Sequence, residues 1–193
     1  VGSFDSKDVG VRAVAIASLT LGGSDGGNYL LLSSTGTATG RILPTPLTIS
    51  ALAQTKVYDG TTLVPSLALG TGYGVSGLVG GESLSSVTLA YANANVSRNG
   101  AGAVLSDKVI TANGAVATAG TDLANYAVSY VGNTASTITP YAVSLTGGQS
   151  GNTFTVSGWA GIVTLAGATG NDRYVFTGNG SARIDEAADA DSD

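Results

Sequence analysis

The sequence predicts an all-β fold of tandem β-sandwich (Ig-like) modules in an elongated array, ending in a short β-solenoid-like segment. Three observations predict this class. Apolar and polar residues alternate in short runs, pairs of turn-forming residues separate these runs, and one stretch of the chain occurs twice. Alternation favours strands because successive side chains of a strand point to opposite faces of its sheet.

The alternating runs recur along the whole chain. They include residues 14–16, 47–49, 87–91, 126–130 and 154–156. Asp59-Gly60 and Asn113-Gly114 are among the pairs expected to form tight turns, because these residues accept the positive φ that hairpin turns require. We expect no amphipathic helix.

The repeated stretch begins at an Asn-Tyr pair and ends at a proline. Asn28-Tyr29 precedes Pro44, and Asn125-Tyr126 precedes Pro140 at nearly the same spacing. Repetition of this kind indicates an array of modules. It favours a structural role for both pairs over ligand binding, with the Asn in a turn and the Tyr ring buried while its hydroxyl is hydrogen-bonded.

Three segments are expected from the repeat. Residues 1–49 are interpreted as the second half of one module, residues 50–145 as a complete module, and residues 146–193 as a Gly- and Asn-rich solenoid-like segment with an acidic tail. In the last segment Phe154 and Tyr174 are 20 residues apart. That spacing is typical of one turn of a β-solenoid.

Composition excludes several functions. Charged residues make up 11% of the 193 residues, and there is no Cys and no His. Thiolate chemistry and a Ser-His-Asp triad are therefore impossible, and we expect no enzyme. The net charge of −5 comes from the last nine residues, and the rest of the chain has no net charge. The sequence therefore shows no basic stripe of the kind that binds nucleic acid. No apolar run is long enough for membrane insertion. The composition suits a secreted or bacterial cell-surface protein.

A family resemblance rests on several motifs in order. The chain contains KVYDGTT at residues 56–62, GVSGLVGGE at residues 74–82, and then the stretch from Asn-Tyr to Ile-Thr-Pro. Residues 1–145 thus resemble the YDG/MBG-type repeat modules of giant bacterial filamentous-haemagglutinin-like surface proteins. The resemblance implies an Ig-like β-sandwich or a related β-fold, used as an adhesin stalk.

The Tyr58-Asp59-Gly60 triplet invites two interpretations. It could be a binding tip, but turn chemistry favours a structural role. In that role Asp59 caps the turn with its side chain, Gly60 supplies a positive φ, and Tyr58 packs.

Calcium is the candidate cofactor. GATGNDRYV at residues 167–175 resembles one nonapeptide of the RTX type, which implies that Asp172 binds Ca²⁺ between successive turns, although Thr153 stands where the earlier turn would need an Asp. Asp189, Asp191 and Asp193 alternate in a way that suits a hard cation. The alternative is a solvated acidic linker.

The function expected from these features is structural. The chain is interpreted as a stalk or fibre-forming region of a secreted surface protein or adhesin. Its partners would be copies of itself or neighbouring modules, because a half-module with an apolar face must find complementary strands. The alternative is a calcium-dependent surface-binding module near a cell-surface anchor. No loop identifies a receptor.

Overall fold

The computed structural model describes residues 1–157, 162–177 and 181–186, and it is all-β there, which confirms the predicted class. Within these ranges it has 15 strands and two short 3-10 helices. None of the described helices is long or apolar enough to cross a membrane. The chain divides into two compact units, the first formed by Val1–Ile49, Val75–Ser85 and Ala115–Ser129, and the second by Ser50–Gly74, Ser86–Gly114 and Tyr130–Asp193.

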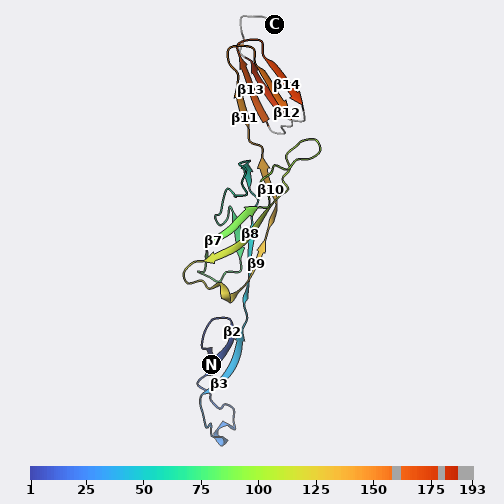
Figure 1. The fold of residues 1–193 in the computed structure, drawn as a ribbon. Helices are drawn as coiled ribbons and strands as arrows, with labels where there is room; N and C mark the ends of the chain where they lie inside the picture. Colours follow the sequence, from blue (N-terminus) through green and yellow to red (C-terminus); the bar gives the residue numbers. More distant parts are fainter. Residues whose placement is uncertain (158–161, 178–180, 187–193) are drawn as a thin grey trace. The chain divides into compact units, whose positions relative to one another are not determined.

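A three-stranded antiparallel sheet opens the chain (Figure 1). Its strands, in spatial order, are β1 (Gly2–Phe4), β2 (Gly10–Ile16) and β3 (Gly36–Ile42). Half-buried and exposed positions alternate along β2, as the sequence pattern predicts. A Cβ at position 40 would lie 2.6 Å from the Phe4 ring, so this ring packs directly on the backbone of Gly40.

Two further sheets come next. A four-stranded sheet has the order β5 (Thr55–Val57), β10 (Asn133–Thr139), β8 (Lys108–Ala117) and β7 (Leu84–Tyr91). In this sheet β10 pairs with β5 in parallel and with β8 antiparallel. A three-stranded sheet has the order β6 (Tyr73–Ser76), β4 (Thr45–Ala51) and β9 (Tyr126–Val131).

The buried side chains lie on alternate positions of these strands. In β4 the side chains of Leu47 and Ile49 have no exposed surface. In the second unit the fully or almost fully buried positions include Val87, Leu89, Tyr91, Ile110 and Ile138. Burying one aliphatic side chain of this size stabilises a fold by about 1.5–3 kcal/mol, so these alternating runs supply much of the driving force for folding.

The two copies of the repeat share part of this topology. Each Asn-Tyr pair ends a short 3-10 helix, η1 (Gly26–Asn28) or η2 (Leu123–Asn125). In the first copy, the strands before and after this helix, β2 and β3, pair antiparallel. In the second copy β8 precedes the helix and pairs antiparallel with β10, which follows it. The second copy also has β9, which begins at Tyr126, whereas residues 29–35 of the first copy form no strand. The two copies therefore diverge at the tyrosine, where only the second one continues as a strand.

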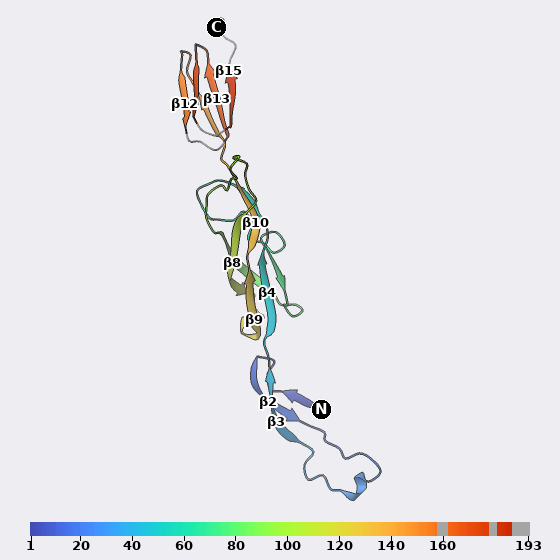
Figure 2. The same ribbon diagram turned by 90° about the vertical axis from the view of Figure 1, so that its right-hand side faces the viewer.

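The C-terminal strands wind in parallel. β11 (Val143–Thr146), β13 (Ile162–Ala168) and β15 (Ser181–Glu186) form one sheet, and β12 (Thr153–Ser157) and β14 (Arg173–Thr177) form another (Figures 1 and 2). Phe154 faces Tyr174 in the parallel register, and their rings stack with centroids 5.3 Å apart. The 20-residue spacing noted in the sequence is thus the offset between paired strands.

Two details differ from expectation. The strand order does not show a tandem array of Ig-like sandwiches. Asn113-Gly114 was expected to form a turn, but both residues lie inside β8, so that prediction was wrong. Gly114 has φ +58°, and a Cβ there would lie 3.1 Å from Thr88 Oγ1. Its positive φ and close contact with the side chain of Thr88 explain a glycine within a continuous strand.

Candidate functional site

The Tyr58-Asp59-Gly60 triplet forms a closed turn. The Asp59 carboxylate accepts hydrogen bonds from the Lys56 ammonium at 2.7 Å and from the Thr61 backbone N–H at 2.9 Å. These bonds, the Lys56 contact foremost, lower the pKa of Asp59 to about 2. Gly60 has φ +75°, as expected, whereas Tyr58 is 40% exposed rather than packed.

Lys56 connects this turn to the interior of the second unit. Its side chain is only 7% exposed, and its Nζ lies 5.4 Å from the centre of the Tyr91 ring. The Tyr91 hydroxyl donates to the carbonyl of Gln54 at 2.9 Å, and burial raises the pKa of Tyr91. Because every polar group named here is satisfied by a neighbour, the arrangement suits a structural turn.

The Asn125-Tyr126 pair is held by residues from distant parts of the first unit. The Asn125 Oδ1 accepts from the Val9 backbone N–H at 2.8 Å, and its Nδ2 donates to Asp8 Oδ1 at 3.2 Å. The Tyr126 hydroxyl donates a short hydrogen bond to Glu82, which raises the pKa of Tyr126, and it accepts from the Val79 backbone N–H at 3.0 Å.

Asp8 completes this cluster. Hydrogen bonds from the Ser6 hydroxyl at 2.8 Å and from Asn125 lower the pKa of the Asp8 carboxyl. A pocket of about 230 Å³ lies beside the cluster, lined by Lys7, Val9, Ile42, Leu43, Thr45, Val79, Glu82, Asn125 and Tyr126. Sequence reasoning did not single out Asp8 or Glu82, because nothing in the local pattern shows which distant residues meet the Asn-Tyr pair.

The Asn28-Tyr29 pair has the same local conformation and none of these partners. Tyr29 has φ −124° and ψ 146°, against −123° and 144° for Tyr126. Yet Tyr29 is 71% exposed, whereas Tyr126 is 8% exposed. The predicted structural role, a buried ring with a bonded hydroxyl, therefore describes Tyr126 and does not describe Tyr29.

Asp172 lies against Asn152 in the C-terminal sheets. Asp172 Oδ1 accepts from the Asn152 backbone N–H at 2.7 Å. Asp172 Oδ2 and Asn152 Oδ1 are both buried and make no hydrogen bond within the described residues. The expectation that Thr153 opposes Asp172 was wrong, because Thr153 pairs with Arg173 and Asn152 is the residue that meets Asp172.

The other proposed metal ligands cannot be placed beside this pair. Asp189, Asp191 and Asp193 lie outside the described residues. Among the residues that are described, no group of three or more acidic side chains could hold a metal ion. Asp172 and Asn152 offer two free oxygens, whereas Ca²⁺ takes about six to eight. Backbone carbonyls or further side chains would have to supply the rest.

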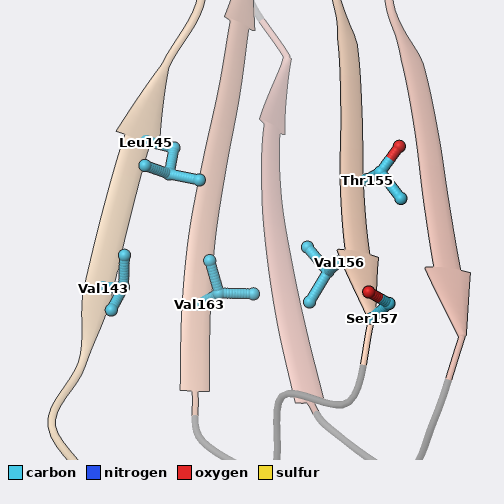
Figure 3. A pocket seen from close by; sticks show the side chains of 6 residues that line it. All are labelled: Val143, Leu145, Thr155, Val156, Ser157 and Val163. Carbon is cyan, nitrogen blue, oxygen red and sulfur yellow. The ribbon is translucent and has the colours of Figure 1, made fainter.

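A second pocket, of about 250 Å³, lies in the C-terminal sheets (Figure 3). It is lined by Val143, Leu145, Thr155, Val156, Ser157 and Val163. None of these lining residues is charged, and Val156 points toward the neighbouring sheet in Figure 3. These features suit the space between packed strands better than a site for chemistry.

The comparisons with known proteins give one match. Residues 43–134 match the YDG domain family. No curated protein and no solved structure gives a significant match. The assignment of residues 1–145 to repeat modules of filamentous-haemagglutinin-like proteins was therefore wrong, since the match covers residues 43–134 and is to the YDG domain. Over that region, which contains the Lys56–Asp59 turn and the Asn125-Tyr126 pair, the chain is similar to a YDG domain.

Proposed function

We propose that this chain is a structural segment of a secreted bacterial surface protein, acting as a stalk or fibre-forming region rather than as an enzyme. The observation that carries the proposal is the Asn125-Tyr126 cluster. In it, Asp8 and Val9 form hydrogen bonds with Asn125, and β4 pairs with β9, the strand that follows Asn125. Segments that hold one another by strand pairing and shared hydrogen bonds suit a load-bearing array.

Composition supports the same role. Charged residues are 11% of the chain and Cys is absent, a combination that suits a protein exported unfolded and displayed outside the cell. The side chains of Asp59 and Asn125 bond to neighbouring side chains or to backbone, which supports a structural role for both. The partners are then copies of this chain or neighbouring modules of the same polypeptide.

Sedimentation velocity over a wide concentration range tests this function. The expected result is larger species whose share grows with protein concentration, because exposed strand edges pair with other chains. A single monomeric boundary at every concentration would remove the fibre-forming role.

Calcium binding is a second candidate function, favoured by the two unpaired buried oxygens of Asn152 and Asp172. A buried carboxylate oxygen without a partner costs free energy, and a cation would offset that cost. Calorimetric titration of Ca²⁺ into chelator-treated protein is expected to give binding heat that the Asp172→Asn variant reduces. Absence of heat, with no change in melting temperature, rules the site out.

A further inference from the structure

The segment after Asn28 is a strand-forming sequence without a strand partner. We call residues 29–34 the acceptor segment. Its residues Leu30 and Leu32 are 82% and 91% exposed. The backbone groups of residues 30–32 make no hydrogen bonds within the part of the chain that the structure describes. An apolar stretch with free backbone donors and acceptors is a template for pairing with another strand.

The second copy shows what completes such a segment. There β9, which starts at Tyr126 as the acceptor segment starts at Tyr29, pairs with β4. The Ser129 hydroxyl donates to the carbonyl of Leu47 at 3.2 Å and lies 3.2 Å from Thr48 Oγ1. β4 begins immediately after Pro44, so the partner of this segment is the strand next to the repeat's proline.

The chain has a second strand in that position. β11 comes after Pro140 as β4 comes after Pro44, and the residues match in character, with Val143, Ser144 and Leu145 in place of Leu47, Thr48 and Ile49. Among the described strands, β11 is paired with β13 on one side only. Leu145 is 45% exposed, and neither β11 nor the acceptor segment contains a charged residue that would oppose pairing.

We propose that β11 of one chain pairs with the acceptor segment of a second copy of the same chain. The contact joins different surfaces of the two copies, so each joined chain keeps a free surface that can pair with a further copy. The inference rests on the proposed structural function and adds the two strands that join. The second copy of the repeat sets the register, because the Thr48–Ser129 contact corresponds to Ser144 opposite Leu32.

Site-directed cross-linking tests the pairing. The chain has no Cys, so Leu32→Cys and Ser144→Cys variants each carry one thiol, and both substitutions are on exposed positions that leave the fold intact. Mixed under oxidising conditions, they are expected to form the mixed disulfide dimer at least tenfold faster than a control mixture. In the control, Leu63→Cys, also on an exposed residue, replaces Leu32→Cys. Thr48→Cys with Ser129→Cys in one chain provides the reference rate for a paired contact.

The result also separates this pairing from the proposed function. Preferential formation of the Leu32–Ser144 cross-link, together with concentration-dependent sedimentation, supports the pairing. Larger species without preferential cross-linking would overturn the pairing. The fibre-forming function would then stand, with the chains joined through other strands. Equal cross-linking of the variant and control mixtures, with monomers at all concentrations, would overturn both.

Discussion

The two Asn-Tyr pairs of this chain share a local conformation and differ in their surroundings. Both end a three-residue 3-10 helix, and the two tyrosines have backbone angles within about two degrees of each other. Only Tyr126 is buried and bonded to Glu82. The comparison teaches that the repeated residues set the turn, whereas burial depends on strands supplied from elsewhere.

Removing each tyrosine gives the largest expected difference between the copies. Tyr126→Ala should lower the free energy of unfolding by about 3–5 kcal/mol, because a buried aromatic ring is lost. Tyr29→Ala should change it by less than about 0.5 kcal/mol, since the ring is exposed. Urea denaturation of the two variants measures both values, and equal losses would contradict the difference in burial.

Removing each asparagine should give a smaller difference of the same sign. Asn125→Ala removes the bonds to Val9 and Asp8 and is expected to cost about 1–3 kcal/mol. Asn28 makes no side-chain hydrogen bond within the described residues, so Asn28→Ala serves as the matched control with little effect. A cost at position 28 as large as that at position 125 would show that the first copy has partners of its own.

The smallest expected effect is on the pKa of Asp8, a residue of the cluster around Asn125 and Tyr126 in the second copy. Because the folded pKa of Asp8 is lowered, its contribution to stability is present above the unfolded value of 3.8 and is lost as the pH falls through the folded pKa. Ser6→Ala removes the main cause and should raise the pKa of Asp8 toward 3.8.

Carboxyl titration by NMR measures this shift. Asp59, with a pKa of about 2, is the internal control, because its partners Lys56 and Thr61 are unchanged by the substitution at Ser6. An Asp8 pKa that stays the same in Ser6→Ala would show that the Ser6 hydroxyl does not stabilise the carboxylate.

Local sequence patterns predicted several of the strands and some of the site. Alternation located β4, β7 and β9, and the 20-residue spacing between Phe154 and Tyr174 matched the parallel register. Turn chemistry identified the roles of Asp59 and Gly60. These features depend on neighbouring residues or on a fixed period, which a single sequence contains.

Features that depend on distant residues were not predicted. The contacts of Asn125 with Asp8 and Val9 join residues more than 110 positions apart, and no local pattern encodes such a choice. The pairing of Asp172 with Asn152 was missed by one position, because the register of paired strands is set by the whole turn between them. The exposure of Tyr29 was missed because the repeat predicts the same burial for both tyrosines, although only Tyr126 is buried.

Amide hydrogen exchange compares the acceptor segment with β9, its counterpart in the second copy. In dilute protein, the amides of β9 should be protected, and those of residues 30–32 should exchange as in an unstructured chain. At high concentration, protection of residues 30–32 should rise in step with the larger species seen by sedimentation. Strong protection of residues 30–32 in the dilute monomer, or larger species that leave these amides unprotected, would contradict the proposed pairing of the acceptor segment.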